Sequence, residues 1–356
     1  MTILHIASID NKLHRGVSVA VPQHIRAQQE LENVALLNIT DIKIPDIQKQ
    51  FSYGKQFRFS SLTLPFSKPD IVVFHEVYCA DYLRLSKQLV KENIPYIIVP
   101  HGSLTRDAQH KKYLKKTAAN FFIFNSFIKK ARALQFLSQR EMSQSAFRNR
   151  AFVGTNGVFL PNVKKTEFHM QGVKLLYIGR LEMQSKGLDI MLEAVSLISE
   201  ELHAQGAKLY IYGPDYKSRY ADMQNLIAKM DVGDLVKLGG VILGEEKQMA
   251  LLDADIFIQT SRSEGMPMGI LEAMGYGVPC LVTEGTNLGR FIKEYDAGWV
   301  AHTDAKSIAQ IIQKAIAAKD DWALKSKNAV NLIEENFLWR KVAQETIQAY
   351  KEVFNS

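Results

Sequence analysis

The sequence predicts an α/β protein with two doubly wound domains, and three observations support this class. The chain has 356 residues, which exceeds the size at which a single hydrophobic core stops growing. In both halves, short runs of apolar and β-branched residues alternate with longer amphipathic segments, as expected of parallel sheets with helical crossovers. Residues 154–172 contain Thr-Asn-Gly and Leu-Pro-Asn without periodicity, and this stretch is the candidate linker.

In the first half, the apolar runs predict strands and the amphipathic runs between them predict helices. The expected strands are 3–8, 34–39, 70–74, 96–99 and 133–138, and the expected helices are 17–31, 81–92, 111–130 and 139–150. Residues 43–69 are polar and aromatic without a pattern, and their structure cannot be assigned from the sequence.

The same alternation restarts after the linker. The expected strands are 174–178, 208–212, 236–238, 255–259 and 279–282, and the expected helices are 187–202, 220–230, 245–252, 268–276, 305–318, 321–335 and 338–353. We therefore expect a first domain at 1–160, a second at 161–337, and a separate terminal helix at 338–356. With 47% hydrophobic and 23% charged residues, the composition is that of an ordinary globular protein.

The segment that follows the predicted strand at 255–259 is the most informative part of the chain. It reads SRSEGMPMGILEAMGYGVP from Ser261 to Pro279, so Glu264 lies on a strand-to-helix loop and Glu272 lies within the next helix. Such loops are at the carboxyl edge of an open sheet, where ligands bind, and a helix N-terminus favours an anion. Two carboxylates beside an anion site are compatible with a ligand that also offers hydroxyl groups. A sugar nucleotide has this chemistry.

Glu264 and Glu272, within Ser-x-x-Glu-Gly-x-Pro-x-Gly-x-Leu-Glu-Ala-Met, resemble the two-glutamate motif of the family 4 retaining glycosyltransferases of bacterial surface polysaccharides. The resemblance implies the GT-B fold, in which two Rossmann-like domains face each other and the last helix crosses back to the first domain. It also implies that Glu272 binds the ribose of a nucleotide-sugar donor. Glu264 and the backbone after it would hold the transferred hexose, and the expected donor-binding residues there are Gly265, Met266, Gly269 and Ile270.

A second motif combines a glycine turn with two cations. Gly179-Arg180 ends the predicted strand 174–178, and Lys186-Gly187 opens the next helix. This pattern favours a phosphate site, and arginine can bind phosphate bidentately, although cations in such loops are often merely solvated. The pattern resembles the family's Gly-Arg…Lys-Gly element, which makes Arg180 and Lys186 expected diphosphate ligands. The spacing is one residue longer than in many members.

Three further positions are expected near the ligand. His101, before Gly102 at the end of the predicted strand 96–99, matches the family's histidine beside the transferred sugar, where a hydroxyl contact is expected rather than general-base catalysis. Gly16 is the single glycine where many relatives have a Gly-Gly pair, and Arg15 before it has no assigned role. Gly213 ends the predicted strand 208–212, where an ordinary turn explains it equally well.

No metal, cofactor or nucleic-acid motif is visible, since Walker, Gly-x-Gly-x-x-Gly and Gly-x-Ser-x-Gly patterns are absent. Asp253-Ala-Asp255 has the form of a metal-binding Asp-x-Asp, but it opens a predicted strand at the end away from the ligand, so cap and turn roles are expected. Cys79 and Cys280 give no disulfide framework and indicate a reducing compartment. We expect metal-independent catalysis, with the nucleotide sugar as co-substrate.

The basic residues are unevenly distributed. Residues 111–150 hold ten Lys and Arg but one acid, Glu141, and they include several phenylalanines. Exposed aromatics with cations favour an anionic lipid surface, whereas buried aromatics beside a solvated basic face would carry no such meaning. No nucleic-acid fold is recognised. A strand at the start of the chain leaves no room for a signal peptide, and no run is long enough to span a membrane. We expect a cytoplasmic protein, peripheral on the inner face of the plasma membrane.

The expected function is transfer of a hexose from a UDP- or GDP-linked donor to a lipid-linked saccharide in cell-surface polysaccharide biosynthesis. The catalytic candidates are Glu264, His101, Arg180 and Lys186. Two alternatives stay open. One is a sugar-nucleotide epimerase of the same fold, and the other is a non-catalytic subunit that binds the donor.

Overall fold

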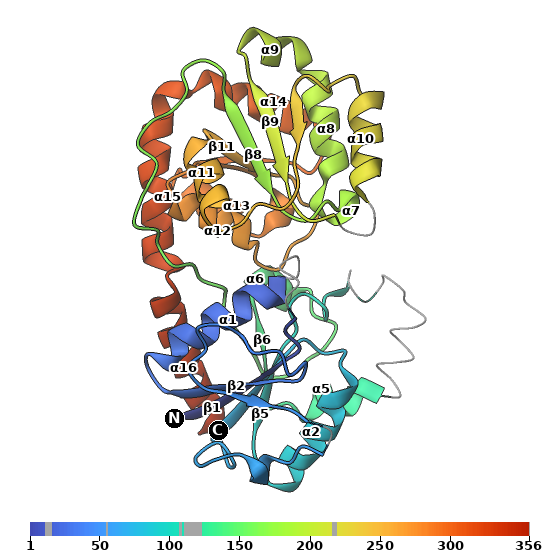
Figure 1. Cartoon of the computed structure of the whole chain (residues 1–356), viewed down its shortest axis with the longest axis vertical. Helices are drawn as coiled ribbons and strands as arrows, with labels where there is room; N and C mark the ends of the chain where they lie inside the picture. Colours follow the sequence, from blue (N-terminus) through green and yellow to red (C-terminus); the bar gives the residue numbers. More distant parts are fainter. Residues whose placement is uncertain (11–15, 55, 107–108, 110–122, 216–218, 356) are drawn as a thin grey trace. The chain divides into compact units, whose positions relative to one another are not determined.

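The computed structural model describes residues 1–10, 16–54, 56–106, 109, 123–215 and 219–355. It divides into two compact units (Figure 1). Unit 1 comprises Met1–Gly157 together with Trp339–Ser356, and unit 2 comprises Val158–Leu338. The chain therefore returns to unit 1 after unit 2 is complete.

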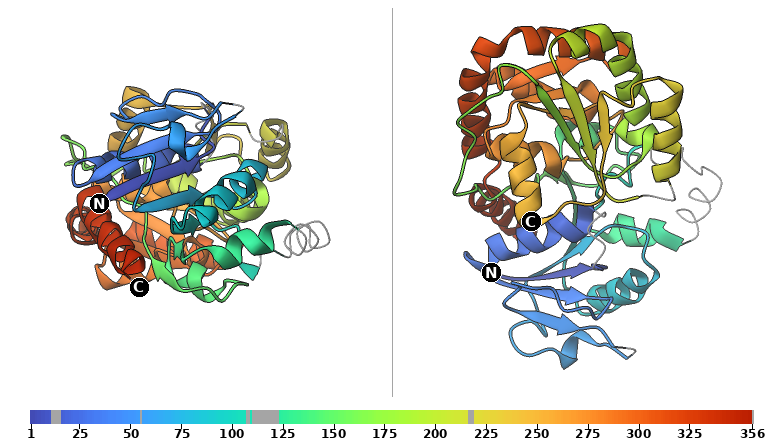
Figure 2. Two further views of the ribbon diagram at one scale, coloured as in Figure 1. Left: turned by 90° about the horizontal axis from the view of Figure 1, so that it is seen from below. Right: turned by 45° about the horizontal axis from the view of Figure 1, so that its top comes forward.

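Unit 1 is an open parallel sheet with helices on both faces (Figures 1 and 2). The strand order is β3-β2-β1-β4-β5-β6-β7, so the order reverses between β1 and β4. The elements in chain order are β1 Thr2–Ala7, α1 Gly16–Gln29, β2 Asn33–Asn38, β3 Gln50–Ser52, η1 Phe59–Ser61, β4 Ile71–His75, α2 Ala80–Lys91, β5 Tyr96–Val99, α5 Asn125–Lys130, β6 Ala133–Phe136, α6 Gln139–Ser143, β7 Ala151–Val153 and α16 Trp339–Phe354.

The two faces of this sheet are covered differently because successive side chains of a strand point to opposite sides. One face is apolar: Leu4, Ile6, Val72 and Phe74 join a buried cluster with residues of α2 and α5. The opposite face is covered by α1 and α16, which lie side by side in unit 1. The Trp339 indole N–H donates to Gln23 Oε1 at 2.8 Å, which ties the start of α16 to α1.

Unit 2 repeats the arrangement with the order β10-β9-β8-β11-β12-β13, and here the order reverses between β8 and β11. Its elements are β8 Lys174–Ile178, α7 Met183–Lys186, α8 Leu188–Leu197, α9 Ser199–Ala204, β9 Lys208–Tyr212, α10 Arg219–Lys229, β10 Val236–Leu238, α11 Gly244–Asp253, β11 Ile256–Gln259, α12 Met268–Gly275, β12 Cys280–Thr283, η3 Glu284–Thr286, α13 Gly289–Glu294, β13 Gly298–Ala301, α14 Ala305–Ala317, η4 Lys319–Asp321 and α15 Trp322–Asn336.

The core of unit 2 follows the period of two along its strands. Alternate residues such as Leu175 and Tyr177, or Ile256 and Ile258, join one buried cluster with α8 and α14. In Figure 1, α8 and α10 lie on one side of β8 and β9, with α12 and α13 on the other. These layers confirm the predicted α/β, doubly wound class.

Several elements differ from the sequence prediction. The short strands β3, β7 and β13 and the helices α7 and α13 were not predicted, because three- to six-residue elements give too few positions to show a period. Lys186 therefore ends α7 rather than opening the next helix. The predicted helix 187–202 is divided, since Ile198 has φ −125° and ψ 27° and separates α8 from α9. Of the predicted helix 111–130, the structure describes α5 at its end, and residues 111–122 lie outside the described residues.

The predicted helix 139–150 is wrong beyond Ser143, where α6 ends. The Ser145 hydroxyl donates to Phe147 O at 3.1 Å and accepts from Phe147 N at 3.1 Å, and Ser145 also pairs with Thr105 in an isolated antiparallel bridge. Serine hydroxyls compete in this way with the helical backbone for hydrogen bonds. The chain therefore leaves the helix and turns toward β7.

Candidate functional site

The candidate donor site lies where the strand order of unit 2 reverses. The predicted motifs follow β8 and β11, the two strands on either side of this reversal. Ligands of open α/β sheets bind at such a switch point, beyond the carboxyl ends of the strands. The topology therefore gathers Gly179, Arg180, Lys186 and Glu264 at one edge of the sheet.

The glycines at this edge allow backbone segments to approach closely. A Cβ atom on Gly213 would lie 1.7 Å from the carbonyl oxygen of Gly179, and one on Gly179 would lie 2.5 Å from the Tyr177 hydroxyl. The Gly179 N–H donates to Tyr212 O at 2.9 Å, and the Tyr177 hydroxyl donates to Arg180 O at 3.0 Å. These contacts give Gly179 and Gly213 a packing role at the ends of β8 and β9, whatever else they contact.

Lys186 and Glu264 form the centre of the site. Lys186 Nζ lies 2.5 Å from Glu264 Oε1, and the same oxygen accepts from Ser261 Oγ at 2.7 Å and Gln259 Nε2 at 3.0 Å. The two charged side chains are mostly buried, with 14% of Lys186 and 13% of Glu264 exposed. Three donors, Lys186, Gln259 and Ser261, therefore hold the carboxylate in a fixed position. One of these donors, the Lys186 ammonium group, is also partly exposed to solvent.

The loop that carries Glu264 is fastened on both sides. Arg262 binds Asp189 bidentately, with N–O distances of 2.7 and 2.8 Å, and thereby links the loop to α8. The Asn287 side-chain amide donates to the carbonyl oxygens of Glu264 and Gly265, at 2.8 Å for Gly265. Bidentate arginine–carboxylate pairs restrict geometry as well as adding energy, so this loop is held in one conformation.

The loop leads into α12, which begins at Met268 after Pro267. Gly269 lies at the first turn, where a Cβ would come within 3.2 Å of the carbonyl oxygen of Ile178. The first amides of a helix have no partner within the helix. In the described part of the chain, the N–H groups of Gly265, Met266, Gly269 and Ile270 donate to no protein acceptor, so they are available to an anion.

Glu272 lies in the second turn of α12 and forms its own ion pair. Its Oε2 atom is 2.5 Å from Nζ of Lys247, a residue of α11. The pair is partly exposed, with 26% of the lysine and 19% of the glutamate side chain accessible. Sequence reasoning did not find Lys247, because a lysine on a polar helix that begins with two glutamates gives no signal of its own.

Asn287, Gln259 and Ser261 were also missed. Gln259 and Ser261 are buried and hold the Glu264 carboxylate. Asn287 has φ 66°, in the left-handed region that asparagine tolerates, and this backbone conformation directs its amide at the Glu264 loop. The one available signal was the run of polar residues Gln259, Thr260 and Ser261 at the end of an otherwise apolar strand.

In unit 1, His101 follows β5 and has φ 50°, an uncommon conformation for a residue other than glycine. Gly102 follows with φ 82°, and its N–H donates to the buried Glu141 carboxylate at 2.5 Å. Burial raises the pKa of Glu141, while the amides of Leu137 and Gly102 oppose that rise. A buried carboxylate thus secures the turn that presents His101.

Gly16 opens α1, and a Cβ placed on it would meet nothing within 4 Å. Unlike at Gly179 and Gly213, packing against the described residues does not require a glycine here. Arg15 lies outside the described residues.

The Asp253–Asp255 pair lies at the end of β11 away from the site. Asp255 is fully buried and accepts from the backbone N–H groups of His169 and Lys174, both at 2.9 Å, while Lys174 Nζ is 2.7 Å from Asp253. Both acids thus have protein partners. No group of three or more His, Cys, Asp or Glu side chains among the described residues is placed to hold a metal ion.

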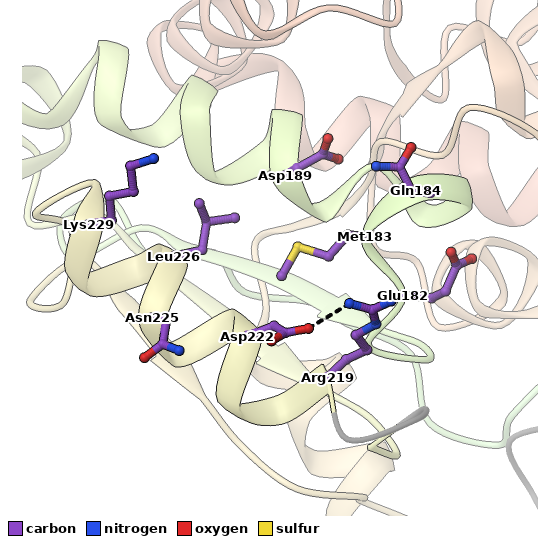
Figure 3. A pocket seen from close by; sticks show the side chains of 9 residues that line it. All are labelled: Glu182, Met183, Gln184, Asp189, Arg219, Asp222, Asn225, Leu226 and Lys229. Carbon is purple, nitrogen blue, oxygen red and sulfur yellow. Dashed lines mark hydrogen bonds and ion pairs between the residues drawn. The ribbon is translucent and has the colours of Figure 1, made fainter.

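A separate hollow of about 450 Å³ lies between the segment 182–189 and α10 (Figure 3). Its lining includes Glu182, Asp189 and the ion pair of Arg219 with Asp222, 2.6 Å apart. The lining does not include Lys186, Glu264 or Glu272. The hollow is therefore distinct from the candidate donor site, although Asp189 links the two through Arg262.

The described phenylalanines of the basic stretch pack in or against the core. Phe124, Phe127 and Phe136 are buried in the apolar cluster of unit 1, so these three offer no exposed aromatic surface, and Phe121 and Phe122 lie outside the described residues. The described cations of this stretch are exposed: Lys129, Lys130, Arg132, Arg140, Arg148 and Arg150. Lys111, Lys112, Lys115 and Lys116 lie outside the described residues. No helix in the described ranges combines the length and the apolar composition needed to cross a bilayer.

Comparisons with known proteins identify a family domain in unit 2. Residues 172–318 match the family described as glycosyl transferases group 1. Among curated proteins, the chain is 29% identical over 167 residues to the amylovoran biosynthesis glycosyltransferase AmsK of Erwinia amylovora, a match that covers 45% of this chain and 40% of AmsK. It is 23% identical over 292 residues to the GDP-mannose:cellobiosyl-diphosphopolyprenol alpha-mannosyltransferase of Xanthomonas oryzae, covering 80% of this chain and 74% of that enzyme.

Solved structures match along the whole chain. Sucrose-phosphate synthase from Thermosynechococcus elongatus superposes with a TM-score of 0.76 at 16% identity, covering 100% of both chains. Anabaena HepE, solved in complex with UDP and glucose, superposes with a TM-score of 0.75 at 14% identity, covering 99% of this chain and 100% of HepE. The chain therefore has the GT-B fold and carries, at residues 172–318, a domain of the glycosyl transferases group 1 family.

Proposed function

We propose that this protein is a retaining, metal-independent glycosyltransferase that transfers a hexose from a UDP- or GDP-linked donor to a lipid-linked saccharide, in cell-surface polysaccharide biosynthesis. The pairing of Lys186 with Glu264 at the switch point of unit 2 is the observation that carries this proposal. The ammonium group suits a diphosphate, and the fixed carboxylate suits the hydroxyl groups of a sugar. A nucleotide sugar presents both groups within a few atoms of each other.

The diphosphate would bind between the cations and the start of α12. Lys186 and Arg180 follow β8, and the open N–H groups of Gly269 and Ile270 follow β11. The negative charge on the diphosphate grows as the bond to the sugar breaks, so donors placed in advance lower the barrier. Catalysis would then need no metal ion, because cations and backbone dipoles stabilise the leaving group.

The hexose would bind to Glu264 and the ribose would bind to Glu272. Glu264 is fixed by Ser261 and Gln259, which leaves its second oxygen for hexose hydroxyls. Glu272, paired with Lys247, would accept from the ribose hydroxyls. The acceptor would attack on the face that the diphosphate leaves, with a phosphate oxygen taking the proton, so no protein nucleophile is required.

The acceptor is proposed from charge and from one relative. The exposed cations at 129–150 would favour an acceptor or surface that carries phosphate. The Xanthomonas relative is named for a diphosphopolyprenol acceptor. A lipid-linked diphosphate saccharide at the cytoplasmic face of a membrane combines both features.

A two-stage experiment tests the proposal. Thermal shift with a panel of UDP- and GDP-sugars first finds the donor, with Lys186→Met expected to abolish the shift and Lys229→Met, in the hollow of Figure 3, expected to keep it. Turnover is then measured with polyprenyl-diphosphate saccharides in the presence of EDTA.

Each outcome separates the candidates. Nucleotide release that requires the acceptor, with the anomeric configuration kept, supports a retaining transferase. A changed sugar nucleotide formed without acceptor indicates an epimerase, and tight donor binding without turnover indicates a binding subunit. Strict dependence on added Mg²⁺ or Mn²⁺ would refute metal-independent catalysis.

A further inference from the structure

A diagonal line of histidines crosses the sheet of unit 1 and ends at His101. His5 on β1 pairs in register with Val73 on β4, and His75 on β4 pairs with Val99 on β5. Each histidine is thus two residues nearer the carboxyl edge than the one on the preceding strand. Side chains two residues apart share a face, so all three rings lie on the face covered by α1 and α16.

The rings are joined by hydrogen bonds. His5 Nδ1 is 2.9 Å from His75 Nε2, and His75 Nδ1 is 3.1 Å from His101 Nε2. His5 and His75 are 0% and 1% exposed, whereas His101 is half-buried at the sheet edge. At the inner end, His5 Nε2 is 2.7 Å from Oε1 of Gln28 on α1.

The contacts of Gln28 decide which ring nitrogen donates in each hydrogen bond of the line of histidines. The Thr346 hydroxyl on α16 donates to the carbonyl oxygen of Val342 at 2.8 Å, so its oxygen can accept from Gln28 Nε2 at 3.1 Å. This places the Gln28 amide oxygen toward His5, which must donate from Nε2. A neutral imidazole has one donor and one acceptor, so each ring accepts at Nδ1 and donates at Nε2 in turn. His101 then carries its proton on Nε2.

The environment keeps the rings neutral. Burial lowers the pKa of His5 to about 4 against the opposing hydrogen bond of Gln28, and burial lowers the pKa of His101 to about 4. Burial, followed by the neighbouring His5, His101 and His24, lowers the pKa of His75 well below its usual value. In the parts of unit 1 that the structure describes, no hydrogen-bond partner contacts His101 Nδ1.

We infer that Gln28, His5 and His75 are positioning residues that hold His101 as the Nε2–H tautomer, so that its Nδ1 accepts a hydrogen bond from a hydroxyl of the transferred hexose. The substrate contact rests on the proposed glycosyltransferase function, whereas the tautomer rests on the line of contacts alone. A fixed tautomer would make His101 select among donor sugars. A sugar with a hydroxyl group at this point can donate to Nδ1, and a sugar without one leaves Nδ1 without a hydrogen-bond partner.

Nitrogen NMR of the full chain with ¹⁵N-labelled histidine tests the tautomer without any ligand. Two- and three-bond proton–nitrogen correlations distinguish protonated from bare ring nitrogens, and His5→Gln, His75→Gln and His101→Gln assign the signals. We expect a bare Nδ1 and a protonated Nε2 at His101 above pH 6. A protonated Nδ1 at His101, or rapid exchange between the two tautomers in the wild type, would overturn the inference.

A variant of Gln28 then tests its control over His101. Gln28→Leu removes the acceptor for His5, so the single tautomer should be lost and kcat/KM for the donor should fall about tenfold. Tyr96→Phe removes another buried hydrogen bond of unit 1, from the hydroxyl to Phe127 O at 2.6 Å, and should change neither.

The two proposals fail separately. A lost tautomer in Gln28→Leu with unchanged kcat/KM shows that the line does not act on the substrate. Absence of donor binding and turnover in the wild type refutes the proposed function and the sugar contact with it, while the tautomer is still decided by the NMR spectra.

Discussion

Replacing Gly187 with alanine should have two effects: it should destabilise unit 2, and it should displace the neighbouring Lys186. Gly187 has φ 65°, and a Cβ at this position would lie 2.1 Å from the carbonyl oxygen of Thr260. The Thr260 hydroxyl in turn donates to Gly187 O at 2.9 Å. The neighbour is backbone at the end of β11, so it cannot rotate away as a side chain would.

The expected loss has two parts. A left-handed conformation costs about 1–2 kcal/mol for a residue with a Cβ. Overpacking against a fixed neighbour costs about 1–3 kcal/mol more. The free energy of unfolding of unit 2 should therefore fall by about 2–5 kcal/mol, which corresponds to about 4–20 °C in Tm for a domain of this size.

Urea unfolding and calorimetry measure the loss, and Gly240→Ala is the matched control. Gly240 accepts from the Gly213 N–H at the same edge of the sheet, but a Cβ on Gly240 meets nothing within 4 Å. The control should stay within about 0.5 kcal/mol of the wild type. A Gly187→Ala protein as stable as the control, with unchanged donor affinity, would refute this account of the loop.

Three further predictions follow from other contacts. Glu272→Gln keeps the size of the side chain but removes the charge that pairs with Lys247. The affinity for the donor, measured by calorimetry, should weaken about 13- to 160-fold. An unchanged Kd would show that Glu272 is not part of the donor site. His5 and His101 have folded-state pKa values of about 4 against 6.5 unfolded, so below pH 6.5 the unfolded chain binds more protons and stability should fall as the pH drops from 6.5 to 4. Urea unfolding at intervals across this range, with His5→Gln showing a smaller decline, checks the sign, and equal declines would contradict it. Changing the exposed Lys129 and Lys130 to Glu should weaken sedimentation with anionic vesicles at low salt but leave donor binding intact, because each cation near such a surface contributes about 1 kcal/mol; equal sedimentation of variant and wild type would count against a membrane-bound acceptor.

The fold class was predictable because it depends on long repeating patterns. The alternation of strands and helices, with a restart after residue 172, was enough to predict two doubly wound sheets. Short elements could not be predicted in the same way. The end of α6 depends on a hydrogen bond of Ser145, and β7 exists because three residues pair with β6. In both cases, contacts with distant parts of the chain outweigh the local preference of the sequence for a helix or a strand.

The site was predictable where chemistry and loop position coincide in sequence. Glu264 stood out because it follows a strand, and Lys186 stood out because it was predicted to open the helix after Gly179-Arg180; the structure brings the two into contact. Lys247 and Asn287 did not stand out, since they reach the site from α11 and from the turn after η3. Their roles depend on which helices pack beside β11, and this is information that no local pattern contains. Whether any of these residues binds a donor stays a prediction.

Because α16 returns to unit 1, the two units complete their folding during synthesis in the reverse of the usual order. Chains commonly fold from the N-terminal domain onward as they emerge. Here all of Val158–Leu338 leaves the ribosome before Trp339, so unit 2 has its full set of contacts first. Until α16 arrives, α1 lacks Trp339 against His24 and Thr346 against Gln28, and its polar core groups remain open to water. Unit 1 is thus completed after unit 2, because it needs residues that are translated after Leu338.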